Sequence, residues 1–365
     1  MGDTLNNTAP DNENCLLAMT HSTPTDLWND SANPQEIKRA IEYGAVGATC
    51  NPVLAFAAIK ANNARWTNRI LQLAASKSDM NPSEIGWQVV EELSQDSARL
   101  LMPAFEQYSG KNGRLSIQTD PRLYSSAQSI VDQAVAYSKL APNIIVKIPA
   151  TTTGLAAIEE ATFRGVSVNV TVSFTTAQAI AAADAIERGL RRRESTGGDT
   201  TRMGPVVTIM VGRLDDWLRN VVKAQKIEID PGLLDWAGVA TFKNAYDIFC
   251  RREFRARLLV AAFRSTLHLT EFVGGDVVVS APPSWQTVIN DLGLPLEERI
   301  DVPVDDQIIA TLLDRVGEFR RAYEPDGLPA GEFDTFGATT RTIQEFLGAT
   351  VELDTFVDDV LASRA

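Results

Sequence analysis

The sequence predicts an α/β fold, a (β/α)8 TIM barrel with additional helices at its C-terminal end. Eight short apolar runs, rich in β-branched residues, recur along the chain. Between them lie longer stretches whose apolar residues repeat every three or four positions, as in amphipathic helices. The apolar runs are nearly continuous, which is typical of parallel strands covered on both faces. Eight alternations fit a barrel; a doubly wound sheet is the alternative, although no GxGxxG motif follows the first strand.

Each expected strand has its own segment of the sequence. The eight segments are residues 26–30, 45–50, 114–119, 143–149, 166–172, 205–211, 257–263 and 276–282. The clearest helical patterns are residues 34–44, 125–140, 153–165 and 175–190. The order of these segments is the alternation that a parallel barrel requires.

Two regions depart from the alternation. Residues 189–204 are polar and glycine-rich, which predicts a long surface loop. From about residue 299 onward the pattern is helical, interrupted by a Pro/Gly loop at residues 324–337. We therefore expect one barrel domain over residues 21–365, with a helical extension that docks across one face of the barrel. Residues 1–20 are polar and acidic and are expected to form a disordered arm.

Composition excludes several classes of function. A net charge of −13 argues against nucleic acid and anionic membranes as partners, because no surplus of Lys and Arg displaces phosphate counterions. Local arginines still allow a small anionic substrate. The three cysteines have no metal-site spacing and are expected as reduced thiols of a cytoplasmic protein. We find no signal peptide, no transmembrane run and no nucleotide, zinc or hydrolase motif, so we expect no cofactor and no metal.

Lys147 stands within the apolar run NIIVKIP of the fourth expected strand. Burying an ammonium group is costly, so its position has two interpretations. In the first, the side chain extends to the mouth of the barrel and its charge meets a carboxylate. In the second, burial lowers the pKa of the amine, which then attacks a ketone and forms a Schiff base. A protonated imine draws electrons from the neighbouring C–C bond.

Polar residues near the ends of other strands form the candidate site, because barrel enzymes react at that end. Asp30 ends the first strand and is either a general acid/base or the N-cap of the next helix. Asn51 follows the second strand and is either a ligand for substrate hydroxyls or an Asn-Pro turn residue. Gln118 lies near the end of the third strand. Asn169 and Thr171 are two residues apart on the fifth, so their side chains share one face.

Two arginines follow neighbouring strands. Arg213 comes after the sixth strand and Arg264 after the seventh. A lone arginine is usually a surface charge, but two at adjacent strand ends are placed to hold a phosphate. The two histidines, His21 and His268, lack ligand spacing and are expected to be structural or exposed.

Taken together, these segments resemble the transaldolase family of class I aldolases. The motifs are GATCNP (47–52), SIQTDPRL (116–123), VKIPATTTGLAAI (146–158), VSVNVTVSFTTAQA (166–179), VGRLDDW (211–217) and AAFRS (261–265). They occur in the family's order and spacing, from about residue 24 to about residue 290. The lysine and Asn-x-Thr motifs are the most specific ones. The resemblance extends to the longer bacterial form of the family.

The resemblance implies a role for each candidate residue. Lys147 takes the place of the Schiff-base lysine and Asp30 that of the acid/base aspartate. The remaining matches are Asn51, Asn169 and Thr208 for substrate hydroxyls, Thr171 for the catalytic water, and Arg213 and Arg264 for the phosphate. One position departs: the family's strand-three glutamate, which holds the water, is Gln118 here. Fructose 6-phosphate aldolases of the same superfamily carry glutamine there with a sixth-strand tyrosine, where this chain has Met210.

Three functions follow from this pattern. The first is a transaldolase of the pentose phosphate pathway type, which transfers a dihydroxyacetone unit from a ketose phosphate to an aldose phosphate. The second is an aldolase that releases free dihydroxyacetone, which the glutamine favours. The third is a retired enzyme that binds sugar phosphate or a protein partner, against which the complete set of candidate residues argues. The sequence does not determine the oligomeric state, for which a homodimer is one alternative.

Overall fold

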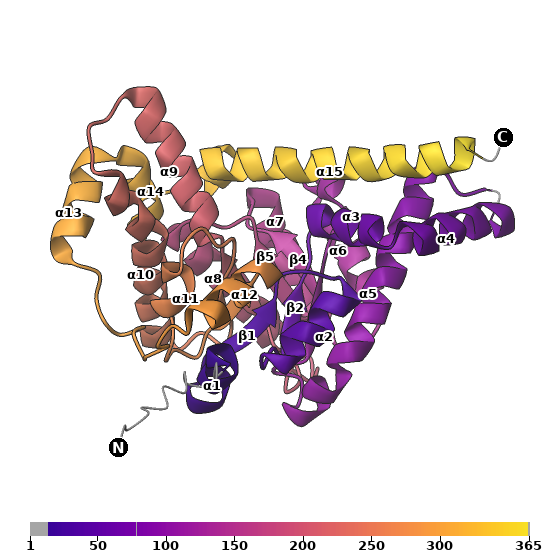
Figure 1. Ribbon diagram of the computed structural model, residues 1–365, viewed down its shortest axis with the longest axis horizontal. Helices are drawn as coiled ribbons and strands as arrows, with labels where there is room; N and C mark the ends of the chain where they lie inside the picture. Colours follow the sequence, from indigo (N-terminus) through magenta and orange to yellow (C-terminus); the bar gives the residue numbers. More distant parts are fainter. Residues whose placement is uncertain (1–13, 78, 364–365) are drawn as a thin grey trace, which may run out of the picture.

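A computed structural model describes residues 14–77 and 79–363 (Figure 1). Eight parallel strands close into a barrel in sequence order, with β1 paired to β8. The strands are β1 Asp26–Asn29, β2 Gly47–Thr49, β3 Arg114–Gln118, β4 Ile144–Pro149, β5 Val168–Thr171, β6 Val206–Ile209, β7 Arg257–Val260 and β8 Val278–Ala281. Each lies within its expected segment, so the predicted (β/α)8 barrel is confirmed.

Helices separate the strands and continue past β8. Those up to β8 are α1 Cys15–Ser22, α2 Pro34–Glu42, α3 Pro52–Ala61, α4 Asn63–Ser76, α5 Pro82–Gln107, α6 Ala127–Tyr137, α7 Thr152–Phe163, α8 Thr176–Ser195, α9 Val211–Gln225, α10 Ala237–Arg251 and α11 Leu267–Thr270. Those after β8 are α12 Pro283–Leu292, α13 Asp306–Arg315, α14 Gly317–Tyr323 and α15 Gly337–Ala362. Short 3-10 helices are η1 Pro121–Leu123, η2 Pro231–Trp236 and η3 Ala330–Thr335.

Two boundaries differ from the sequence-based expectation. The loop predicted at residues 189–204 begins later, because α8 continues to Ser195. Arg192 on this extra turn donates to Glu159 at 2.9 Å and to Glu160 at 3.0 Å, both on α7, and these contacts favour the helix. At the other boundary, α1 includes residues that we expected in the disordered arm, while residues 1–13 lie outside the described part of the chain.

Three Asn-Pro pairs begin helices α2, α3 and α5. In each, the asparagine side chain accepts a hydrogen bond from a backbone N–H of the first turn, and proline occupies the first helical position. At α5, Glu84 returns the bond to the backbone of Asn81 and completes a capping box. The same dipeptide therefore stops the chain after β1 and β2 and turns it into a helix at the barrel rim.

The barrel interior has two kinds of layer. One is an apolar cluster made of Trp28, Ile145, Val206, Leu259, Ala261 and Val278. Gly47 makes room for it, since a Cβ there would lie 2.5 Å from the ring of Trp28. Farther along the strands the inward residues become polar, including Thr49, Ser116 and Asn169, all buried.

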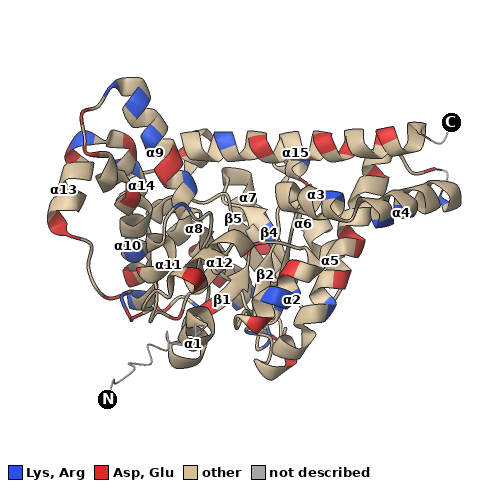
Figure 2. Ribbon diagram, in the orientation of Figure 1, with Lys and Arg blue, Asp and Glu red and all other residues tan. Residues whose placement is uncertain are grey.

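Helix α15 lies across the C-terminal end of the barrel. Figure 1 shows it as a long yellow helix along one side of the molecule, and it packs on α3, α4, α5, α9 and η1. Acidic and basic residues both occur along it (Figure 2). This is the docking that the sequence predicted for the C-terminal extension. Among the described residues, no helix has the length and apolar character needed to cross a membrane.

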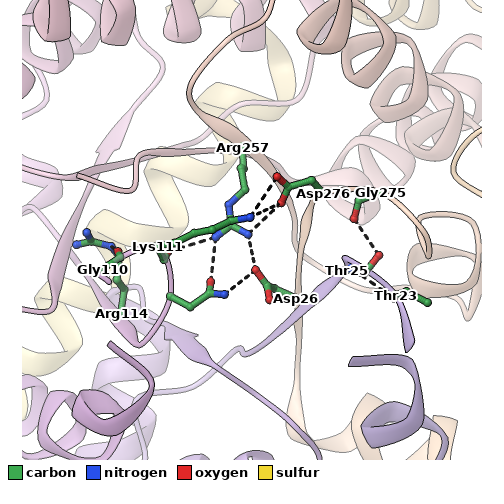
Figure 3. A network of polar contacts seen from close by, with 10 residues as sticks. Thr23, Thr25, Asp26, Gly110, Lys111, Arg114, Arg257, Gly275 and Asp276 are labelled. Atoms are coloured by element: carbon green, nitrogen blue, oxygen red, sulfur yellow. Dashed lines mark hydrogen bonds and ion pairs between the residues drawn. The ribbon is translucent and has the colours of Figure 1, made fainter. Parts of the chain in front are cut away.

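Polar contacts close the opposite end of the barrel (Figure 3). Arg257 at the start of β7 pairs with Asp26 at the start of β1, and its Nη2 donates to Asn112 at 2.9 Å. Asn112 donates in turn to Asp26 at 2.8 Å, and Lys111 pairs with Asp276 at 3.0 Å. These contacts join strand beginnings that are distant in sequence.

Candidate active site

Lys147 lies in the middle of the barrel wall, paired in register with Gln118 on β3 and Asn169 on β5. Only 4% of the residue is exposed. Burial lowers the pKa of its ammonium below the ordinary value, against the opposing effect of the Asp30 carboxylate. Its Nζ makes no hydrogen bond or ion pair with any described residue. A buried amine of this kind is suited to attack a carbonyl carbon.

Asp30 follows β1 directly and faces the same interior. Its Oδ1 accepts a hydrogen bond of 2.6 Å from the hydroxyl of Thr49. Burial raises its pKa above the ordinary value, while the charge of Lys147 and the Thr49 hydrogen bond act in the opposite direction. The N-cap of α2 is Asn33, so the capping interpretation of Asp30 is wrong. A carboxyl group whose pKa is raised beside a lysine is suited to proton transfer.

Two unsatisfied polar atoms flank Lys147 on its neighbouring strands. Oε1 of Gln118 and Oγ1 of Thr171 are both buried, and neither has a hydrogen-bond partner among the described residues. An unpaired buried polar atom costs roughly 1–3 kcal/mol, so such atoms usually have a water or ligand partner. Sequence reasoning placed both residues near the lysine, and the structure brings them there. They are positioned to hold a water or a substrate hydroxyl.

Asn169 and Thr208 are engaged within the barrel. Asn169 Nδ2 donates to Ser116 at 2.8 Å, and its Oδ1 accepts from Thr208 at 2.7 Å. Both are buried, and the contacts tie β3, β5 and β6 together beside Lys147. Their predicted contact with substrate thus stays a prediction, since the bonds present here hold the barrel wall.

Asn51 has the turn role expected of its Asn-Pro motif, and its role as a substrate ligand stays a prediction. Its Oδ1 accepts from the backbone N–H of Leu54 at 3.0 Å, which makes it the N-cap of α3. Its amide nitrogen makes no hydrogen bond to the described residues and stays available for a substrate hydroxyl. Beside it lies Cys50, which sequence reasoning missed as a site residue; burial raises the pKa of this thiol to about 12. No group of His, Cys, Asp or Glu in the described part of the chain is arranged to hold a metal ion.

A strained turn follows β5. Val172 has φ = 52°, a left-handed conformation that is rare for a β-branched residue. Gln178 braces the turn, because its side chain donates to the carbonyls of Ala150 and Val172 and accepts from the backbone of Phe174. Such strain commonly occurs at functional sites, and here it is adjacent to Thr171. The sequence carries no clear signal for it.

The two arginines lie near each other at the mouth of the barrel, but each already has a carboxylate partner. Arg213, in the first turn of α9, donates to both oxygens of Glu345 on α15, at 2.6 and 2.7 Å. Arg264, after β7, donates to Asp216 at 2.8 Å. Their proximity follows from Glu345, whose pKa is lowered first by the hydrogen bond from Arg213 and further by the charge of Arg264. The sequence did not indicate these carboxylate partners.

The family model for transaldolase/fructose-6-phosphate aldolase matches residues 27–323, which is most of the chain. The chain belongs to this family. A transaldolase from Thiobacillus denitrificans shares 28% identity over 301 residues, covering 76% of this chain and 82% of that protein. One from Saccharopolyspora erythraea shares 31% over 67% of this chain and 68% of its own length. A transaldolase from Mycolicibacterium smegmatis shares 29% identity over 77% of this chain and 82% of its own length.

Within this transaldolase-family barrel, His268 is structural and buried. Its Nδ1 accepts the backbone N–H of Arg264 at 2.9 Å, so the proton is on Nε2, which donates to Asp215 at 2.9 Å. Asp215 also accepts from the backbone of Gly238 at 2.8 Å. This chain of hydrogen bonds holds the turn after β7, where Ala262 has φ = 66°. The structural interpretation of His268 is confirmed.

Proposed function

We propose that this chain transfers a dihydroxyacetone unit from a ketose phosphate to an aldose phosphate through a Schiff base on Lys147. The observation that supports this most is a buried lysine that has no partner among the described residues and whose charge acts on Asp30. The unsatisfied oxygens of Gln118 and Thr171 lie on the strands at either side of it. The test is a product assay with and without an acceptor aldehyde, read together with the trapping experiment described below.

The first half-reaction breaks the donor. The neutral amine of Lys147 adds to the ketone carbon, and loss of water gives a protonated imine. The Asp30 carboxylate takes the proton of the C4 hydroxyl, the C3–C4 bond breaks, and its electron pair moves to the imine as an enamine. The aldehyde fragment leaves, and the three-carbon unit stays on Lys147.

The second half-reaction joins the unit to the acceptor. The enamine attacks the acceptor's aldehyde carbon, and protonated Asp30 returns a proton to the new alkoxide. Water held by Gln118 and Thr171 then adds to the imine, and the amine of Lys147 leaves with release of the new ketose phosphate. The amide of Asn51 holds a donor hydroxyl throughout. Each step uses a side chain that the barrel places at one end.

Release of free dihydroxyacetone is the second candidate function. Gln118 favours it, because fructose 6-phosphate aldolases carry glutamine at the matching position. Met210 disfavours it, because a thioether lacks the hydroxyl with which the tyrosine of those enzymes helps to hold the water. We expect transfer to dominate, and measurement of dihydroxyacetone without an acceptor distinguishes the two activities.

The Gln118→Glu variant is expected to raise the rate of transfer to erythrose 4-phosphate by about tenfold, equivalent to about 1.4 kcal/mol in the barrier. Glutamate accepts and releases a proton through the bound water, whereas glutamine only orients it. Steady-state kinetics and the melting temperature of both proteins provide the measurement. An equally active or slower Glu variant with unchanged trapping at Lys147 would show that Gln118 serves another arrangement of water or substrate.

Replacing Arg264 with alanine is expected to reduce kcat/KM for fructose 6-phosphate by about ten- to a hundredfold. A hydrogen bond to a charged group contributes about 1.5–3 kcal/mol, which corresponds to that loss. Activity with unphosphorylated fructose should change much less. Arg188→Ala is the matched control, because Arg188 forms a surface pair with Glu159 on α7. Equal losses with both sugars would indicate a structural role for Arg264.

We also propose a cellular location and binding partners for the protein. Sugar phosphates are its substrates, in the pentose phosphate pathway, and neither nucleic acid nor membrane is a partner. A cytoplasmic location is supported by Cys15, Cys50 and Cys250, which are free thiols in the described structure. Light scattering of the purified protein tests whether it is a homodimer.

A further inference from the structure

The carboxylate of Glu345, on the C-terminal helix α15, accepts two hydrogen bonds from the guanidinium group of Arg213. Nη1 of Arg213 donates to Oε2 of Glu345 at 2.6 Å, and Nη2 donates to Oε1 at 2.7 Å. This two-bond geometry is the one with which arginine binds either a carboxylate or a phosphate. The Arg213 side chain is 18% exposed and that of Glu345 is 44% exposed. The pair is therefore open to exchange with a dissolved anion.

The surroundings of Glu345 are those of an anion site. Its pKa is lowered by the hydrogen bond from Arg213, and by the charges of Arg264 and Arg341. Three arginines thus favour a negative charge at one point above the barrel. The charge of Arg213 also acts on Asp30 and Lys147, so Arg213 lies within electrostatic range of the reacting groups.

The rest of α15 holds Glu345 over the site. Ile343 and Phe346, on either side of it in sequence, line a small cavity together with Gln118 and Val172. Farther along the helix, Leu353 lines a second cavity with Gln118. The helix is thus packed on the residues that surround Lys147. A substrate that reaches Lys147 with a phosphate near Arg213 must meet the Glu345 carboxylate.

We propose that Glu345 is a specificity-determining residue that competes with the substrate's phosphate for Arg213. This inference rests on the proposed function, because it takes Arg213 as a phosphate ligand. The resting chain holds its own anion at the position where the phosphate binds, and a phosphorylated sugar must displace it. The contact weakens binding of all phosphorylated substrates and leaves unphosphorylated sugars unaffected. It therefore sets how strongly the site selects for a phosphate.

The test removes the charge of Glu345 and keeps its shape. We expect Glu345→Gln to lower the KM for fructose 6-phosphate about two- to fivefold, the range for loss of a partly exposed ion pair. Inorganic phosphate should bind more tightly by a similar factor in calorimetry, which needs no catalysis. The KM for unphosphorylated fructose should not change. Glu345→Ala is a second variant that also removes the competing carboxylate.

Two controls make the experiment specific. Glu352→Gln neutralises an exposed carboxylate on the same helix that makes no ion pair with the described residues, and it should leave every parameter unchanged. In an Arg213→Ala background, Glu345→Gln should have no effect on phosphate binding, because the contested group is gone. A gain that persists without Arg213 would overturn the proposal and indicate a general effect of charge.

The outcomes separate this inference from the proposed function. If borohydride traps fructose 6-phosphate on Lys147 but both Glu345 variants bind phosphate as weakly as the original chain, the competition is refuted alone. Weaker phosphate binding in both variants also refutes it, and shows that Glu345 supports the site by fixing α15. If no adduct forms on Lys147, the proposed function fails, while calorimetry with phosphate still decides the role of Glu345.

Discussion

Borohydride reduction in the presence of fructose 6-phosphate is expected to attach a reduced sugar or dihydroxyacetone fragment to Lys147. The reason is the position of the amine: it is buried, it makes no hydrogen bond with the described residues, and burial lowers its pKa, which favours the neutral, nucleophilic form. Peptide mapping by mass spectrometry locates the label. Lys147→Met should lose the label together with all measurable transfer activity.

The control for trapping is Lys243, a partly buried lysine. Lys243 also has a lowered pKa from burial, but its Nζ donates to Glu271 at 2.8 Å and to two backbone carbonyls. Its amine is therefore engaged, and Lys243 should remain unlabelled. A label on any lysine other than Lys147, or none with several ketose phosphates, contradicts the mechanism.

Lys147 should also lower the free energy of unfolding of the chain. Its pKa is lower in the folded chain than in the unfolded chain, so between these two pKa values the unfolded state binds more protons. The free energy of unfolding therefore contains a penalty that is present below the ordinary value and shrinks as pH rises toward it. Lys147→Met, which removes this penalty, is expected to melt at a higher temperature than the original chain at neutral pH.

The sequence predicted the barrel and most of the site because both depend on local patterns. The lysine within NIIVKIP and the Asn-x-Thr pair on β5 occur at strand positions where alternation determines which way a side chain points. The N-cap alternative for Asp30 failed for a local reason: Asn33, three residues later and directly before Pro34, caps α2.

Contacts between distant segments could not be predicted in the same way. Helical periodicity indicated that α15 would cover one face of the barrel, but not that Glu345 would meet Arg213. Likewise, the polar stretch after Leu190 is typical of a loop by composition, but α8 continues to Ser195, and Arg192 on this extra turn pairs with Glu159 and Glu160 of α7. Partners of charged side chains depend on the tertiary packing, which a single sequence does not specify.

Asp30→Asn is expected to reduce kcat for transfer by about 10²- to 10⁴-fold, the usual contribution of a general acid/base. The imine should still form, because Lys147 remains, but the C4 hydroxyl proton has no acceptor and the C3–C4 bond stays intact. Borohydride should therefore trap the whole sugar phosphate on this variant, and mass spectrometry distinguishes that adduct from the dihydroxyacetone fragment. A variant that still yields the three-carbon adduct at the original rate would assign the proton transfer to another group.

Thr49→Val provides the matched change next to this carboxyl group. The hydroxyl of Thr49 donates to Asp30 at 2.6 Å and so helps to keep the pKa of that carboxyl from rising further. Removing it should raise this pKa, so that the low-pH limb of the rate profile moves to higher pH while the maximum rate changes much less than in Asp30→Asn. A limb that stays in place in Thr49→Val would mean that a group other than Asp30 titrates in the reaction.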